Sequence, residues 1–196
     1  MKKLLFAAAI VLLGAGCMTT PPVAPAPTPT AQKPVIQFTY NCGSYKMLSP
    51  ERQVAINAIL KNGGQKDLAA SGDVCAQSSE DRPVLVTTDN CTQTGCTKAS
   101  LLLVDTAANT LKVVATEDTS EILGAAAIGQ VLSWTDTSVT YRAPGYVFDG
   151  PCIEANIKGQ LAYHDVQVTL ATGKKSDVQS CTYLSCKQDL TCTNKP

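Results

Sequence analysis

The cysteines constrain the fold of this chain more than any other feature. Nine cysteines occur in 196 residues, and eight of them lie between positions 42 and 192. Disulfides persist in oxidising compartments and are rare in the cytosol, so this number of cysteines indicates an exported protein. Eight cysteines allow up to four bridges, in about 105 pairings. The disulfide candidates are Cys42, Cys75, Cys91, Cys96, Cys152, Cys181, Cys186 and Cys192.

Cysteine spacing suggests one of these pairings. Cys91–Cys96 and Cys181–Cys186 each enclose four residues and could close small loops. Cys42–Cys75 could join a first strand to the helix that follows it, which leaves Cys152–Cys192. Each bridge typically adds about 2–4 kcal/mol to stability by restricting the unfolded chain. Such bridges would compensate for a core that is poor in aromatic residues, which make up 5% of the chain.

The first sixteen residues have the pattern of an export signal. Lys2 and Lys3 form a basic start, and residues 4–16 are an apolar run of thirteen. This run is shorter than the roughly 20 residues that span a bilayer, but it has the length of a signal-peptide core. Small residues then lead directly into Cys17. We therefore expect residues 1–16 to be a signal peptide.

The segment around Cys17 resembles the lipobox of bacterial lipoproteins, with Gly14-Ala15-Gly16 before the cysteine and Leu13 one step earlier. In that family the cysteine receives a diacylglycerol, the signal is cut just before it, and the new amine is acylated. The resemblance implies that Cys17 is the lipid attachment residue, with fatty-acyl chains such as palmitate. Gly14 stands where the family prefers leucine. An ordinary cleaved signal, with Cys17 as a spare thiol, is the alternative.

The resemblance also implies a location. Residue 18 is Met rather than Asp, which in enterobacterial lipoproteins implies export to the outer membrane. We therefore expect a bacterial outer-membrane protein held by its lipid, with its domain in the periplasm or at the cell surface. Removing residues 1–16 takes away two lysines and changes the net charge from 0 to about −2. Membrane attachment would then depend on acyl chains and not on a basic patch.

Residues 17–34 form a tether in this interpretation. Six of the eleven prolines fall here, with Ala and Thr between them. Such a composition favours extended polyproline II, at about 3.1 Å per residue. A proline-rich ligand for a partner groove is the alternative function of this stretch. Residues 35–196 are left as one disulfide-rich domain.

The start of this domain predicts a strand and then a helix. Residues 35–40 alternate, which points Ile36, Phe38 and Tyr40 inward. Ser49 and Pro50 then form a helix start, with Ser as the cap and Pro at the first helical position. The predicted helix covers residues 50–61, and its expected apolar face consists of Val54, Ala55, Ala58 and Ile59.

Most of the chain after Arg82 is strand-like. Runs at 84–86, 101–104 and 110–116 are rich in β-branched and aliphatic residues, and residues 106–109 predict a hairpin turn. A second hairpin turns at 135–138. Segment 120–129 is ambiguous, with a short helix slightly favoured. Further predicted features are a strand-like stretch at 153–170, whose apolar face flips at His164-Asp165, and a turn at 171–174.

Two hairpins, VDTAANTLKVV and VTLATGKKSDV, look like those in β-propeller blades. A closed propeller usually needs at least about four blades, and only two copies occur here. The prediction is therefore a mainly β domain with a minor α part. We expect a disulfide-braced antiparallel β-sandwich or a partly open barrel, with one helix near its N-terminus.

No catalytic or metal-binding motif is found. The chain has one histidine, His164, and no G-x-S-x-G elbow, C-x-x-C pair, phosphate loop or calcium loop. We expect no metal, no cofactor and no enzymatic activity. His164 should be a solvated residue at a strand end, on the polar face of residues 154–158. Trp134, the only tryptophan, is expected to pack in the core.

These observations favour a lipid-anchored cell-envelope protein with a binding or structural role. Its partner could be an envelope protein, peptidoglycan or a saccharide; net neutrality argues against nucleic acid. Two other classes stay open. A deep polar pocket that gathers Asp or Glu with His164 would favour a hydrolase, and a protruding braced loop, such as 89–97 or 181–192, would favour an inhibitor of a foreign hydrolase. A flat apolar patch would favour a scaffold.

Overall fold

The computed structural model describes residues 34–65, 73–79, 81–92, 95–118, 128–145, 151–187 and 189–195. For residues 89–97 and 118, nothing is stated about the side chains. The expected signal peptide, Cys17, nearly all of the tether and most of segment 120–129 lie outside the described residues. Within the described part, no helix is long and apolar enough to cross a membrane.

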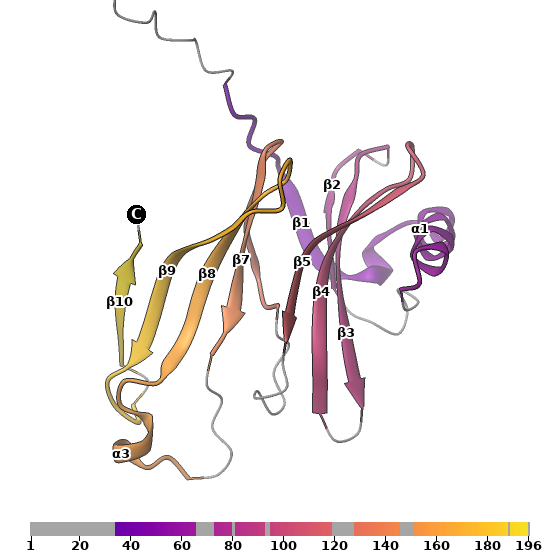
Figure 1. The fold of residues 1–196 in the computed structure, drawn as a ribbon. Helices are drawn as coiled ribbons and strands as arrows, with labels where there is room; N and C mark the ends of the chain where they lie inside the picture. The colour runs from indigo at the N-terminus through magenta and orange to yellow at the C-terminus, as the bar shows by residue number, and fades with distance from the viewer. Residues whose placement is uncertain are drawn as a thin grey trace, which may run out of the picture. The chain divides into compact units, whose positions relative to one another are not determined.

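Ten strands form two antiparallel sheets of five (Figure 1). The first sheet follows chain order: β1 (Tyr40–Ser44), β2 (Asp73–Gln77), β3 (Val84–Thr92), β4 (Gly95–Asp105) and β5 (Thr110–Asp118). The second sheet consists of β6 (Val131–Trp134), β7 (Ser138–Pro144), β8 (Leu161–Thr169), β9 (Lys175–Tyr183) and β10 (Leu190–Asn194). Its strands lie side by side in the order β10-β9-β8-β7-β6. Neither sheet closes on itself. The expectation of a mainly β, antiparallel domain with one N-terminal helix is confirmed.

That helix is α1 (Pro50–Asn62), which begins where the sequence predicted. The Ser49 hydroxyl accepts a hydrogen bond from the Arg52 backbone N–H, as a capping side chain should. The predicted apolar face is wrong in part. The buried residues include Ile56, Ile59 and Leu60, whereas Val54 is 71% exposed. A 3-10 turn, η1 (Tyr45–Met47), precedes the helix, and a four-residue helix, α3 (Glu154–Ile157), precedes β8.

Two cores make this a three-layer structure. Between α1 and one face of the first sheet, a small core includes Ile56, Leu60 and Leu102. The opposite face of the first sheet packs against the second sheet through a larger core, which includes Leu101, Trp134 and Tyr141. Trp134 is 1% exposed, so the prediction that it packs in the core is confirmed. We call the face of the second sheet that carries Tyr141 its inner face.

The N-terminal segment of the domain connects the two sheets. Gln37 pairs with Thr135, and the Phe38 N–H donates to the Trp134 carbonyl, so this segment lies along the edge of β6. The predicted strand at 35–40 is therefore wrong in its bounds, because β1 starts at Tyr40. Phe38 and Tyr40 pack against the larger core, as expected, but Ile36 is 52% exposed. Ile36 is exposed because it lies at the end of the β6 edge. There its backbone N–H donates to the Asp136 carboxylate and its carbonyl accepts from the Asp136 N–H.

The predicted hairpins are confirmed at β4–β5, at β6–β7 and at the turn between β8 and β9. The strand-like reading of 153–170 is wrong at its start, where α3 forms before β8 begins at Leu161. The pairing of β8 with β9 is irregular at Asp165/Val166, close to the predicted change of face. The pairing of β8 with β7 is continuous, so the faces of β8 itself do not exchange.

Three disulfides are described. Cys42–Cys75 joins β1 to β2 and confirms one predicted pair, although it joins two strands rather than a strand and the helix. Cys181–Cys192 joins β9 to β10, and Cys152–Cys186 ties the segment before α3 to the β9–β10 turn. The predicted pairs Cys181–Cys186 and Cys152–Cys192 are therefore wrong, because strand register sets Cys181 opposite Cys192. Cys91 and Cys96 are register partners, but their side chains lie outside the described residues.

Candidate functional site

The candidate site is an open depression of about 260 Å³ where the end of β5 meets the inner face of β8 and β9. We call it the charged depression. Most of its lining side chains are polar or ionisable, and Val166 is the only apolar one. The lining residues are Glu117, His164, Val166, Lys175, Ser176 and Asp177.

Glu117 forms one side of this site and is held by two donors. The Lys175 amine lies 2.7 Å from Glu117 Oε1 and also donates to the Thr116 carbonyl at 2.8 Å. The Tyr141 hydroxyl donates to the same carboxylate oxygen from beneath. Burial raises the pKa of Tyr141 far above its usual value, and the Glu117 hydrogen bond adds to the rise. Tyr141 therefore stays protonated and acts as a hydrogen-bond donor.

Asp177 forms the other side and is paired with two basic groups. The Lys195 amine lies 2.9 Å from Asp177 Oδ2, and His164 Nδ1 lies 3.5 Å from Asp177 Oδ1. The hydrogen bond from Lys195 holds the pKa of Asp177 below its usual range; the nearby His164 charge acts in the same direction, while partial burial opposes it. Asp177 therefore stays ionised at neutral pH.

His164 lies here because of strand register. It is opposite Ala143 on β7 and opposite Ser180 on β9, and it shares its face with Val166, which packs in the larger core. The expectation of a solvated histidine beside residues 154–158 is therefore wrong. Residues 154–157 form a helix instead of continuing β8, so they cannot share a strand face with His164. The His164 side chain is 27% exposed.

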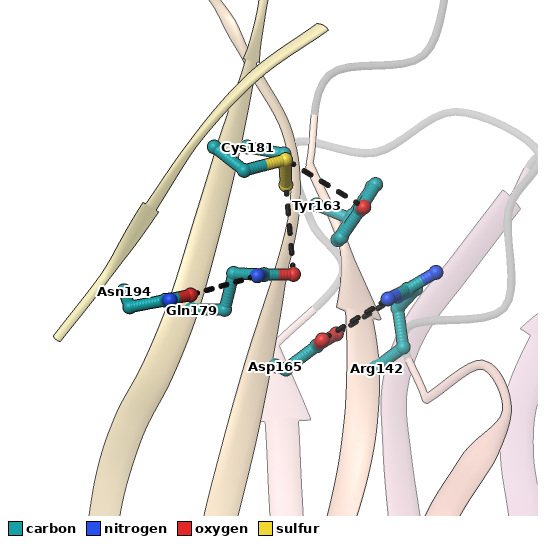
Figure 2. Close-up of polar contacts among 7 residues, drawn as sticks. Arg142, Tyr163, Asp165, Gln179, Cys181 and Asn194 are labelled. Atoms are coloured by element: carbon teal, nitrogen blue, oxygen red, sulfur yellow. Dashed lines mark hydrogen bonds and ion pairs between the residues drawn. A yellow bond between two sulfur atoms is a disulfide. The ribbon is translucent and has the colours of Figure 1, made fainter.

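The opposite, outer face of the second sheet carries a separate polar row (Figure 2). Arg142 holds Asp165 with two hydrogen bonds, of 2.8 and 3.0 Å, and its guanidinium stacks 3.8 Å from the centre of the Tyr163 ring. Nearby, the Gln179 amide donates to Asn194 Oδ1 at 2.8 Å. Asp165 is 6% exposed. The paired and stacked groups satisfy one another, so we interpret this row as structural.

The turn between β9 and β10 is braced by two disulfides, and we call it the braced turn. Cys181–Cys192 closes the ladder at its base, and Cys186 within the turn is bonded to Cys152. Three exposed apolar side chains lie close to these bridges along the chain: Ile153, Leu184 and Leu190, at 58%, 47% and 38% exposure. Residues 181–192, one of the two loops whose protrusion would favour an inhibitor, are therefore braced, but by bridges other than the predicted ones.

The structure brings together residues that the sequence had not connected. The sequence considers His164 as a possible base, assigns Lys175 to a hairpin turn despite its T-x-x-K pattern, and places the acidic pair Glu117-Asp118 in a solvated loop, which is wrong because both residues belong to β5. Glu117 lies on β5, whereas Lys175 and Asp177 lie two positions apart on β9, so strand register and sheet packing are needed to show that the three meet. Within the described residues, no group of three His, Cys, Asp or Glu side chains could hold a metal ion.

Comparison with known proteins adds no relative to this description. No family model, no curated protein and no solved structure matches the chain.

Proposed function

We propose that this chain is a lipid-anchored cell-envelope protein whose β domain binds a polar saccharide, of the kind found in peptidoglycan, in the charged depression. The observation that carries the proposal is the mixed set of donors and acceptors in one open site. Carboxylate oxygens of Glu117 and Asp177 accept hydrogen bonds from sugar hydroxyls, while Lys175 and His164 donate to ring oxygens or to carboxylates on the ligand.

The arrangement favours binding because the side chains are already held in place. Lys175 and Tyr141 fix the Glu117 carboxylate, and Lys195 fixes that of Asp177, before any ligand arrives. A site that is ordered in advance loses less conformational entropy on binding. An apolar ligand is not expected here. Pockets for such ligands are lined mostly by apolar side chains, whereas Val166 is the only apolar side chain in the lining of the charged depression.

Binding to sacculi tests this proposal. The full chain should co-sediment with purified peptidoglycan, and a soluble glycan fragment should compete. Glu117→Gln and His164→Ala should each weaken binding about tenfold, the cost of one hydrogen bond to a charged group. Lys61→Ala, on an exposed part of α1, is the matched control and should bind like the parent. Equal sedimentation of all variants, with unchanged melting temperatures, would refute the assignment of the depression.

A hydrolase is the second candidate, because His164 faces Asp177 while Ser180 is its register partner on β9. These are the residue types of a nucleophile, a base and an orienting acid. If the site hydrolyses glycan-linked esters or amides, Ser180→Ala should abolish product release while leaving sedimentation with sacculi unchanged. If product release continues undiminished in Ser180→Ala, the hydrolase assignment fails.

A further inference from the structure

The edge formed by β10 differs from the other edge of the same sheet. At the β6 edge, the segment around Gln37 adds a paired stretch. β10 is the last strand on the opposite side (Figure 1), and all five of its residues are exposed. Natural proteins protect such edges with charges, prolines or bulges. β10 consists of Leu, Thr, Cys, Thr and Asn, and so contains none of these devices.

The backbone groups that β10 turns outward follow from its pairing with β9. The Lys195 N–H donates to the Val178 carbonyl, and the Asp189 carbonyl accepts from Leu184, so odd-numbered residues point their backbone groups toward β9. Alternation along an antiparallel strand then points the backbone groups of Leu190, Cys192 and Asn194 away from β9. The short Cα–Cα distance of 4.1 Å between Cys181 and Cys192 agrees, because residues opposite each other without hydrogen bonds lie closest.

We propose that β10 pairs with β10 of a second copy of this chain, antiparallel and centred on Cys192. In this register Leu190 lies opposite the second copy's Asn194, so every outward N–H and C=O of the strand finds a partner. Thr191 lies opposite Thr193, a favourable cross-strand pair. The contact is isologous, so it closes as a twofold dimer and does not propagate.

Charge selects this register over its neighbour. Centred on Cys192, the pairing sets Asp189 of each copy opposite Lys195 of the other, on the face that carries Thr191 and Thr193. Moving the centre to Thr191 sets Asp189 opposite Thr193 instead, so this pair of opposite charges is lost. Opposite charges directly across a ladder stabilise it and like charges destabilise it. The Cys181–Cys192 bridge also holds the strand in place before it pairs, which lowers the entropic cost of association.

A charge exchange tests the dimer. We suggest expressing the full chain in a bacterial envelope with a photo-crosslinking residue in place of Thr193, and measuring the crosslinked dimer. Asp189→Lys should lower the dimer yield about fivefold or more, because both symmetric pairs become repulsive. Because the Lys195 amine lies 2.9 Å from Asp177, all variants carry Asp177→Asn. In this background, adding Lys195→Glu to Asp189→Lys restores two attractive pairs with their signs exchanged, and should restore the yield. Asp81→Lys makes the same charge change in the turn before β3 and should leave the yield unchanged.

A second variant blocks the edge itself. Leu190→Pro removes an outward N–H at the first residue of β10 and should lower the dimer yield while the melting temperature of the chain stays near that of the parent. Thr193→Pro instead removes an N–H that points to β9, and should destabilise the domain. The proposal is overturned if the parent gives no crosslinked dimer, if it crosslinks only to a different protein, or if the doubly exchanged variant is folded but stays monomeric.

Discussion

At the scale of single residues, Asp177 connects the charged depression to the acid stability of the domain. Its pKa is lowered in the folded state, chiefly by the hydrogen bond from Lys195. A carboxylate with a lowered pKa contributes stability above its unfolded pKa, near about 3.9, and this contribution is lost as the pH falls through the folded value. The side chain is 37% exposed, so solvent screening keeps the effect small.

We therefore predict that Asp177→Asn lowers the free energy of unfolding at pH 6, and that this loss shrinks as the pH falls through the lowered pKa of folded Asp177, because protonation removes the contribution from the parent as well. Urea unfolding across this pH range measures the difference between parent and variant. Asp81→Asn, in the exposed turn before β3, is the control for losing one carboxylate elsewhere. A difference that stays constant as the pH falls would contradict the prediction.

At the scale of elements, α1 shows how packing decides which helical face is buried. Val54 and Ile56 are both β-branched and lie two positions apart, and only Ile56 enters the small core, where it is fully buried. Ile56→Ala should lower the free energy of unfolding by about 2–5 kcal/mol, because it leaves a cavity between α1 and the first sheet. Val54→Ala, at 71% exposure, should change it by less than about 0.5 kcal/mol. Similar losses in the two variants would contradict this placement of the helix.

Helices and turns could be predicted from the sequence where residues close together in the chain determine them. The cap at Ser49 and the hairpin turns use short-range chemistry, and the structure confirms them. Other features depend on contacts between distant parts of the chain. Strand register and the packing of the layers decide the buried face of α1, the start of β8 and the pairing of Cys181 with Cys192. For the same reason, the charged depression could not be assembled from the sequence, since Glu117 and Asp177 lie on different sheets.

Two cross-strand disulfides offer a matched test of how such bridges stabilise a sheet. Cys42–Cys75 and Cys181–Cys192 each join register partners on adjacent strands, with Cα–Cα distances of 4.0 and 4.1 Å. Their sequence separations differ, at 33 and 11 residues. Chain entropy predicts losses of about 4 and about 3 kcal/mol when each pair is replaced by alanine. Equal losses in equilibrium unfolding would instead favour an enthalpic origin.

At the scale of the whole molecule, the proposed anchor and the proposed dimer reinforce each other. Copies confined to one membrane meet at a higher effective concentration than copies in solution. A single pair of strands is marginal by itself, so confinement would matter for β10 pairing. An extended, proline-rich tether would hold both anchored domains at a similar distance from the membrane, which would let their β10 edges align.

The anchor itself rests on Cys17, and its test is direct. The acyl chains proposed there contribute about 0.8 kcal/mol for each buried methylene, and two or three chains hold a protein to the membrane. Cys17→Ala removes the attachment atom, and with two lysines lost on cleavage the mature chain has no basic patch to replace it. We predict that this variant is found in the soluble periplasmic fraction, whereas the parent sediments with membranes. If Cys17→Ala still fractionates with membranes after a high-salt wash although residues 1–16 have been cleaved from it, the lipid anchor is wrong.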